Sequence, residues 1–358
     1  MFAGKCWSVG SVKDLEVVKN PMKDEMGIAR FRFSDRYSVF DWGEMPDLVE
    51  EKGAALCTMS AYCFERLEEK GIRTHYRGLV QNGRLVTTDR LKRPCNVMEI
   101  DFVNVFHPTP YREAGKLKYD YSVFTPNLTN FLIPLEIMYR NSLPEGSSVF
   151  KRLKQGLKPE DLGLNHYPNH GEKLKEPILD VSTKLEERDR YITWSEAQKI
   201  AGLTDEEIAE IKAILLEANG LITKIASRAN LTNEDGKVEL AFDPQRKLIL
   251  VDAIGTLDEC RFTHKGFHVS KEIARQYYKK TKWYMDVEKA KKEADTKGIK
   301  DWKSLCKSQP PHLDPALEKI ICNAYKAAAN ELTGLGLFDI SSLADVIEEY
   351  QIYLGEQK

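Results

Sequence analysis

The stretch DGKVELAFDPQRKLILVD spans residues 235–252 and decides how the second half of the chain folds. It contains two short apolar runs, Val238–Ala241 and Leu248–Val251. Polar residues with Pro244 among them separate the runs, which is typical of a turn between two strands. The stretch therefore predicts a β-hairpin.

Charged residues alternate along the first strand of this hairpin. Successive side chains of a strand point to opposite faces, so Asp235, Lys237 and Glu239 share one face. The second strand ends at Asp252, and more charge follows in residues 256–262, TLDECRF. So many acids and bases would be costly to bury unless they bind a metal ion and a charged ligand, and the alternative is an exposed salt-bridged face.

Three polar clusters lie upstream, and each could contact an anion. Residues 10–15, GSVKDL, form a small-residue turn whose Lys13 could reach phosphate oxygens. Residues 34–41, SDRYSVFD, follow an expected strand and precede a helix, a common place for a phosphate or ribose contact. Residues 140–148, RNSLPEGSS, combine the planar fork of Arg140 with a Gly-Ser turn. For each cluster the alternative is a solvated turn.

Hydrophobic periodicity divides the chain into two lobes and a tail. Residues 1–105 are predicted to form an N-terminal α+β lobe with one helix around 54–70, and 106–130 reads as a loop. Residues 106–334 are predicted to form a second α+β lobe, and 335–358 an additional helix. Within the second lobe we expect an apolar strand at 131–139, an irregular stretch to 193, a helix opened by a capping box at Thr204 and Glu207, and a helix near 317–328.

Composition restricts the partners and the compartment. Lys and Arg number 53 against 55 Asp and Glu, and the net charge of −2 gives no general attraction to nucleic acid or to an anionic membrane. Seven scattered cysteines without a C-x-x-C pair fit a reduced cytoplasm, and neither a secretory signal nor a membrane span is recognisable. We expect a cytoplasmic protein with small-molecule substrates.

Taken in chain order, the clusters resemble the SAICAR synthetase family. GSVKDL at 10–15 is similar to the family's G-K-V-R-D-L turn, and SDRYSVFD at 34–41 to its D-R-I-S-A-F-D segment. Further similarities are PLEIMYRN at 134–141 with Gly146-Ser147 to the substrate loop, LKEPILDVSTK at 174–184 to L-P-E-P-x-F-x-x-S-T-K, Asp235–Glu239 to D-x-K-x-E, and 251–262 to I-D-E-x-x-T-P-D-S-S-R-F.

The resemblance implies a two-lobed α+β fold related to the ATP-grasp enzymes, with antiparallel sheets, flanking helices and ATP between the lobes. It implies an ATP-dependent ligase that joins carboxyaminoimidazole ribonucleotide to L-aspartate through an acyl phosphate, with ATP and Mg²⁺ bound. Carried over by position, the ATP residues are Ser11, Lys13, Lys184, Glu239 and Asp252, of which Glu239 and Asp252 would also hold the metal ion. The substrate residues are Asp35, Ser38, Arg140, Ser147, Asp189, Lys237, Asp258 and Arg261. Lys13, Lys237 and Arg261 are the expected catalytic residues.

Several positions depart from the family pattern. Arg188 stands where a histidine is usual, Ala253 where a glutamate is usual, and Leu257 where a proline is usual. Since the guanidinium of Arg188 cannot shuttle protons near neutral pH, we expect it to orient a carboxylate of the co-substrate. The departures leave two alternatives open: a paralogous ligase with another carboxylate or amine, and a nucleotide-binding protein without turnover. The apolar stripe of 335–358 suggests a homodimer.

Overall fold

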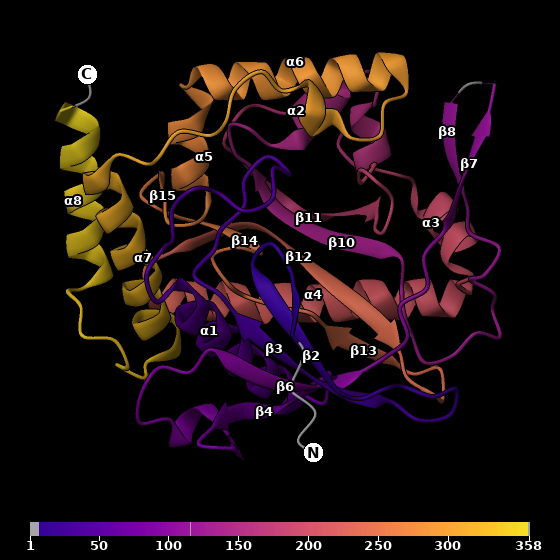
Figure 1. The fold of residues 1–358 in the computed structure, drawn as a ribbon, viewed down its shortest axis with the longest axis horizontal. Coiled ribbons are helices and arrows are strands. Elements are labelled where there is room, and N and C mark those ends of the chain that lie inside the picture. The colour runs from indigo at the N-terminus through magenta and orange to yellow at the C-terminus, as the bar shows by residue number, and fades with distance from the viewer. Residues whose placement is uncertain (1–6, 115, 357–358) are drawn as a thin grey trace.

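A computed structural model describes residues 7–114 and 116–356, which form antiparallel sheets flanked by helices (Figure 1). The first sheet has the strand order β1-β2-β3-β6-β4-β5. Its strands are β1 Trp7–Val9, β2 Lys13–Lys19, β3 Gly27–Phe33, β4 Tyr76–Gln81, β5 Arg84–Val86 and β6 Val97–Phe102. The predicted first lobe begins with residues 1–6, which lie outside the described residues, and the lobe boundaries stay predictions.

The second sheet has the order β11-β10-β12-β14-β15, and β13 and β9 pair with the far part of β12. Its strands are β9 Phe131–Leu132, β10 Leu135–Leu143, β11 Glu172–Thr183, β12 Thr232–Phe242, β13 Leu248–Val251, β14 Cys260–His264 and β15 Phe267–His268. Because β12 pairs with β10, β14, β13 and β9, it is the central strand of the second half of the chain.

The helices cover both sheets. They are α1 Lys52–Glu68, α2 Ser148–Lys154, α3 Trp194–Ala201, α4 Asp205–Arg228, α5 Glu272–Lys279, α6 Lys282–Lys297, α7 Pro315–Thr333 and α8 Leu343–Glu356, with short 3₁₀ turns at Thr88–Arg90, Pro159–Leu162 and Trp302–Leu305. Helix α1 packs on the first sheet, α4 packs on β10 and β12, and both helices also contact α7. Figure 1 shows α5 and α6 on the opposite side of the second sheet from α4.

The strongest sequence patterns are confirmed. The 235–252 stretch forms the predicted hairpin, in which Glu239 faces Val251 and Phe242 faces Leu248. The capping box of α4 is present, with the Thr204 and Glu207 side chains each accepting a bond from the other's backbone N–H. The expected helices at 54–70 and 317–328 correspond to α1 and α7.

The weakly periodic regions were predicted incorrectly. The expected loop at 106–130 contains a hairpin of β7 Thr109–Glu113 and β8 Lys116–Asp120, whose residues in β7 are all exposed and so carry no burial pattern. The expected strand at 131–139 is interrupted before Leu135, where Pro134 has no N–H to donate. The stretch to 193 contains α2 and the long strand β11, and α3, α5 and α6 were not predicted.

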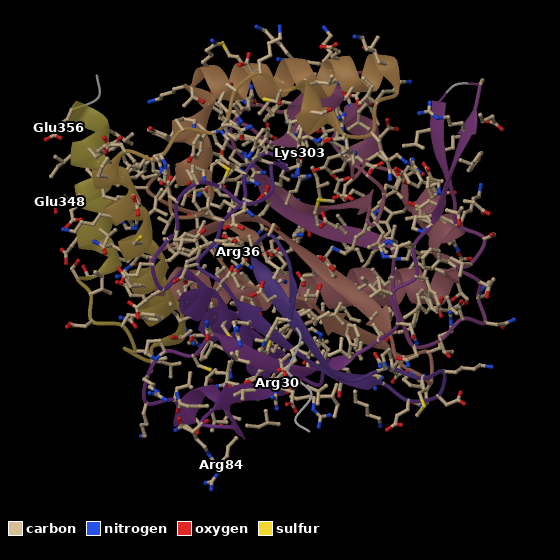
Figure 2. The ribbon with its side chains drawn as sticks, viewed as in Figure 1. Arg30, Arg36, Arg84, Lys303, Glu348 and Glu356 are labelled. Atoms are coloured by element: carbon tan, nitrogen blue, oxygen red, sulfur yellow. The ribbon has the colours of Figure 1, made fainter. Side chains whose placement is uncertain are left out.

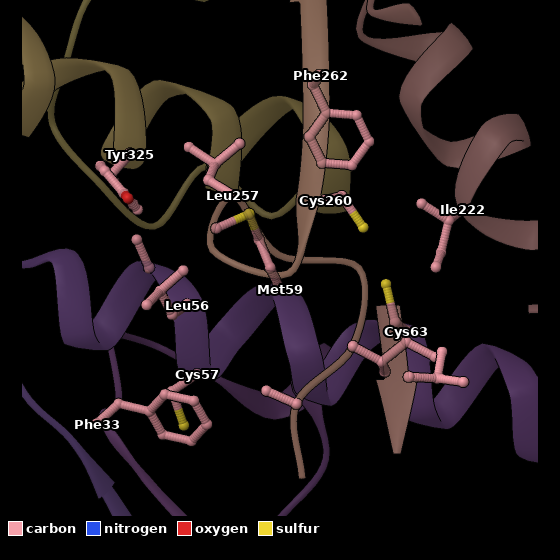
Figure 3. Packing of buried hydrophobic residues seen from close by; sticks show 14 of the residues in the cluster. Phe33, Leu56, Cys57, Met59, Cys63, Ile222, Leu257, Cys260, Phe262 and Tyr325 are labelled. Carbon is pink, nitrogen blue, oxygen red and sulfur yellow. The ribbon is translucent and has the colours of Figure 1, made fainter. Parts of the chain in front are cut away.

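One apolar core joins the two sheets and their helices. Figure 3 shows Leu257, Cys260 and Phe262 packed against Leu56 and Met59 of α1, and all five are at most 4% exposed. Backbone hydrogen bonds join the lobes as well: the N–H of Leu250 in β13 donates to the carbonyl of Arg73 (2.9 Å), and the N–H of His75 donates to the carbonyl of Leu250 (2.9 Å).

The stripe of the C-terminal tail is occupied within the chain. Helix α8 packs along α7, and Leu343, Val346, Ile347 and Tyr350 are buried there (Figure 1, yellow). The stripe therefore gives no support to the expected homodimer, because it has an intramolecular partner. Among the described residues, no helix is both long and apolar enough to cross a membrane.

Candidate functional site

The two faces of the second sheet have opposite character. On one face Tyr139 of β10, Val181 of β11 and Val238 of β12 are buried in the core. On the other face the register places Lys237 opposite Met138 and Asp235 opposite Arg140. The alternation of side chains seen in the sequence therefore continues across β11, β10, β12 and β14. The charged residues of these strands lie on a single surface, which we call the polar face.

One end of the polar face is built from lysines and carboxylates, and we refer to it as the lysine end. The ammonium Nζ of Lys184 lies 2.7 Å from Oε1 of Glu239, and Nζ of Lys237 lies 2.7 Å from Oε1 of Glu136. Lys13 of β2, in the first sheet, forms an ion pair with Asp252. One positive charge of the lysine end, that of Lys13, therefore comes from the first sheet.

Neighbouring charges set the protonation of the two acids there. Burial opposes ionisation of Asp252, but the positive charges of Lys13, Lys184 and Lys237 outweigh it and hold the pKa of Asp252 below its usual range. Burial and the adjacent negative charge of Asp252 raise the pKa of Glu239. The negative charge of one carboxylate thus acts on the other, as expected for two oxygen ligands of one cation.

The other end of the polar face is built from arginines and aspartates, and we refer to it as the arginine end. Arg140 is 3% exposed; its Nη2 lies 3.1 Å from Oδ2 of Asp180 and its Nη1 lies 3.5 Å from Oδ2 of Asp235. Arg152 pairs with Asp180, and Nε of Arg261 lies 2.8 Å from Oδ1 of Asp235. Three arginines against two aspartates leave an excess of one positive charge.

Asp189, a predicted substrate residue, lies in the cleft above the polar face. Although it is solvent-exposed, partial desolvation within the cleft and the negative charge of Glu136 raise its pKa to about 7. Lys184 and Lys237 act in the opposite direction without cancelling the effect. A carboxyl group with a pKa near 7 can accept or release a proton at neutral pH.

Part of the polar face, with Glu136, Arg140 and Lys237, is the floor of a cleft of about 660 Å³, a volume suited to a small-molecule ligand. The other residues of the lysine end, Lys13, Lys184, Glu239 and Asp252, are not among the residues that line it. Its far wall carries Arg275 and Lys279 of α5, and both pair with Glu272, at 3.3 and 2.9 Å. Lys291 of α6 also lines the cleft, and its Nζ lies 2.7 Å from Oδ2 of Asp41 in the first lobe. Several cations from separate elements thus converge on one cavity.

Two predicted substrate residues, Asp35 and Ser38, accept hydrogen bonds from backbone N–H groups of the protein. A carboxylate oxygen of Asp35 accepts the Gly53 N–H at the start of α1 (2.9 Å), and a Cβ on Gly53 would lie 2.3 Å from the carbonyl oxygen of Phe33. The Ser38 hydroxyl accepts the N–H of Gly43 at 3.3 Å. These contacts hold the helix and its preceding loop in place.

Ser147 and Asp258, two further predicted substrate residues, also make contacts within the protein, and their contact with a substrate stays a prediction. The Ser147 hydroxyl caps α2 by accepting the N–H of Val149, whereas the neighbouring Ser148 lines the cleft. Asp258 lines the cleft too, but its carboxylate is paired with Lys52 (2.9 Å) and accepts a hydrogen bond from Tyr325 (2.6 Å).

Ser11 is exposed in the turn before β2. The guanidinium of Arg36 donates to the backbone carbonyl of Gly10 at 3.0 Å, so the 34–41 segment supports this turn (Figure 2). Ser11 is two residues before Lys13 in the sequence, so it lies near the lysine end, on the side of the first sheet.

Of the three departures from the family pattern, Leu257 is buried and lines the cleft, whereas Arg188 and Ala253 do not line it. Arg188 forms an ion pair with Asp295 of α6 and donates to the carbonyl of Lys291 at 3.4 Å. It is absent from the residues that line the cleft, and its contact with a substrate carboxylate stays a prediction. Ala253 is 5% exposed and packs in the core.

Sequence reasoning missed several charged residues of the cleft. Glu136 lies at the same period-two spacing as Arg140, two strand repeats earlier, and this spacing could have revealed it. Lys271, Arg275 and Lys279 recur every fourth residue, the spacing of one helix face. Asp180 had no such signal, because it is the pairing of β11 with β10 that brings it to Arg140.

Comparison with known proteins gives one consistent result. Residues 17–294 match the sequence model of a family described as SAICAR synthetase. A protein of Archaeoglobus fulgidus, provisionally named phosphoribosylaminoimidazole-succinocarboxamide synthase, is 47% identical over 342 residues, which is 95% of this chain and 98% of the relative. The enzyme of that name from Thermoplasma acidophilum is 32% identical over 334 residues, 91% of this chain and 97% of the relative.

Solved structures show the same fold. A type-2 SAICAR synthetase in complex with ADP superposes with a TM-score of 0.54 at 21% identity, over 86% of this chain and all of that one. SAICAR synthase from Saccharomyces cerevisiae, in complex with SAICAR, gives a TM-score of 0.62 at 18% identity, over 93% and 97% of the two chains.

Proposed function

The chain belongs to the SAICAR synthetase family, and from this premise we propose that its cleft joins the carboxylate of carboxyaminoimidazole ribonucleotide to the amino group of L-aspartate. The reaction is that of an ATP-dependent, ADP-forming ligase of purine biosynthesis. The observation that carries the assignment is the lysine end, where Lys13 of the first sheet meets Asp252. Lys237 joins this end to the cleft, because it lines the cleft and its Nζ lies 3.8 Å from Oε1 of Glu239.

ATP would bind between the lobes at the lysine end, as in the ATP-grasp enzymes to which we propose the fold is related. Lys13 and Lys184 are flexible ammonium groups that can turn from their carboxylates to phosphate oxygens. The turn around Ser11 supplies backbone N–H groups to the same anion. Lys237 is the lysine of this end that lines the cleft, where it can neutralise charge on the phosphoryl group as it is transferred.

Glu239 and Asp252 fit a Mg²⁺ ion held jointly with ATP. Mg²⁺ is commonly bound by one or two carboxylates together with substrate phosphates. Glu239 is buried, the side chain of Asp252 is 22% exposed, and lysines balance the charges of both. Within the described residues no group of three or more His, Cys, Asp or Glu side chains forms a complete metal site. The ion would offset negative charge on the phosphates of ATP.

The arginine end would bind the ribonucleotide. Arg140 is held rigidly by Asp180 and Asp235, while Arg261 and the Ser148 hydroxyl line the cleft beside it. The excess positive charge at this end suits a phosphate group. Aspartate would then bind toward α5 and α6, where Arg275 and Lys291 supply cations for its two carboxylates.

The chemistry follows from this arrangement. The carboxylate of the ribonucleotide attacks the γ-phosphorus of ATP, which gives an acyl phosphate and ADP. The aspartate amine then attacks the acyl carbon, phosphate leaves, and the amine loses a proton that Asp189 can accept because its pKa is about 7. The side chains mainly bind, align and neutralise charge, so the protein itself needs no covalent intermediate.

The assay combines purified protein with ATP, Mg²⁺, carboxyaminoimidazole ribonucleotide and L-aspartate. We expect ADP release that depends on all components, and a product whose mass equals the two substrates joined with loss of water. Glutamate, asparagine and glycine replace aspartate in parallel reactions. Equal ADP release with every amino acid, or none with aspartate, would refute the proposed substrate.

A further inference from the structure

Helix α5 has two faces with different neighbours. Arg275 and Lys279, one helical turn apart, line the cleft. Ile273 and Tyr277, also one turn apart, point to the other side and line a cavity of about 270 Å³ between α5, α7 and α8. The same eight-residue helix therefore forms part of the substrate cleft in front and contacts the C-terminal helices behind.

The contact behind α5 centres on Tyr350. This residue of α8 is 6% exposed and lines the 270 Å³ cavity. With Val346 and Ile347 it also borders a much smaller gap of about 10 Å³ against Ile273 of α5. The near-absence of free volume at the smaller gap shows close packing of α8 on the first turn of α5.

Helix α5 depends on such packing for its position. Isolated helices shorter than about 12–15 residues are marginal in water, and α5 spans only Glu272–Lys279, with no hydrogen bond from the side chain of its N-cap residue Lys271. Helix α8 is itself anchored, because Leu343 is buried against the core and its N–H donates to the carboxylate of Glu331 in α7 at 2.6 Å.

We propose that Tyr350 of the C-terminal helix is a positioning residue that sets where α5 presents Arg275 and Lys279 to an anionic substrate. The inference rests on the proposed function of the cleft and extends it to residues beyond the matched span of 17–294. The 270 Å³ cavity supplies the mechanism: removal of the Tyr350 ring enlarges a space that already lies behind α5, so α5 can move away from the cleft.

The test compares Tyr350→Ala with Tyr350→Phe, which keeps the ring, and with Ile352→Ala, a change on the same helix at a residue that is 57% exposed. For Tyr350→Ala we expect the KM of aspartate or of the ribonucleotide to rise at least fivefold, with kcat within twofold of wild type. The affinity for ADP should stay unchanged, since α5 contributes nothing to the lysine end. Tyr350→Phe and Ile352→Ala should match wild type. Unchanged KM values, or an equal loss of ADP affinity, would overturn the proposal.

Hydrogen exchange tests the same coupling without catalysis. In Tyr350→Ala the backbone amides of 273–279 should exchange at least fivefold faster than in wild type, while those of β2 and β12 stay the same. Unchanged exchange in α5 would overturn the proposal, and Tyr350→Leu replaces the alanine variant if that variant does not fold. If wild type forms no product, the proposed function fails, whereas the exchange result still decides whether Tyr350 positions α5.

Discussion

The arginine end and the lysine end lie on the same face of one sheet, yet their charges are paired in different ways. Arg140 is almost fully buried and reaches Asp180 and Asp235 on the strands to either side. The side chains of Lys184 and Lys237 are 23% and 30% exposed, and each makes one contact of 2.7 Å with a carboxylate. Their remaining carboxylate contacts are looser, at 3.9 Å for Lys184 and at 3.4 and 3.8 Å for Lys237. The ion pairs of Arg140 hold its side chain rigidly, whereas each lysine can exchange its carboxylate partner for another anion.

The difference follows from the two cations. A guanidinium has five donors in a fixed plane and can bridge two acids, whereas an ammonium is a point charge on a flexible stem. A site for ATP requires that lysines change partners, because those that pair with carboxylates in the free protein must be able to move to phosphates. A rigid end suits a substrate whose position must not change during the reaction.

The largest effect should come from neutralising the acids of the lysine end. Asp252→Asn and Glu239→Gln should each lower kcat about a thousandfold, or ~4 kcal/mol, because each removes a charged oxygen ligand. Steady-state kinetics measure this, and thermal denaturation should show an intact fold. Near-normal turnover in either variant would mean that the acids only balance the lysines.

Breaking the arginine end should affect binding and stability together. Arg140→Ala leaves Asp180 and Asp235 buried with fewer partners, which should cost about 3–5 kcal/mol of unfolding free energy. The KM for the ribonucleotide should rise more than tenfold, whereas ADP affinity should change less than threefold. Denaturant unfolding and calorimetry measure these quantities, and equal losses of both ligands would assign Arg140 to the nucleotide site.

Asp189 lines the cleft near the lysine end and should set the pH dependence. Because its pKa is raised from 3.8 to about 7, the ionised form appears only as pH rises through 7. If this form accepts the proton of the amine, kcat should be about tenfold lower at pH 6 than at its alkaline plateau. The raised pKa stabilises the fold below about pH 4, and this contribution is lost as pH rises to 7; it is small, since Asp189 is exposed.

The matched variant is Asp189→Asn, which cannot titrate. Its pH–rate profile should lack the limb near pH 7 and lie below wild type throughout. A profile that keeps this limb would place the titrating group elsewhere.

The smallest effect should come from Arg188, which belongs to neither end. Since Arg188 pairs with Asp295 on the outside of the cleft, Arg188→His should be tolerated. Arg188→Glu should change the KM of aspartate less than threefold. A tenfold increase in that KM would support the carboxylate-orienting role that the sequence suggested.

The sequence predicted those parts of the site that lie within single strands. Asp235, Lys237 and Glu239 could be assigned to one face because a strand has a fixed period of two. The partners of Arg140 could not be identified, because Asp180 lies 40 residues away and reaches it only through the register of β10 and β11. Polar turns gave ambiguous results for the same reason: Ser147 and Ser148 are adjacent, and only the start of α2 decides which one faces the cleft.

The backbone hydrogen bonds between Arg73, His75 and Leu250 have a consequence for synthesis. The ribosome completes the first sheet at Phe102, roughly 150 residues before Leu250 is made, an interval of about 7–30 s at 5–20 residues per second. Throughout that interval the carbonyl of Arg73 and the N–H of His75 lack their partner Leu250, and Lys13 has no Asp252 to pair with. The nascent first sheet therefore keeps unpaired backbone groups beside β4, and the lysine end can form only after the last third of the chain has begun to emerge.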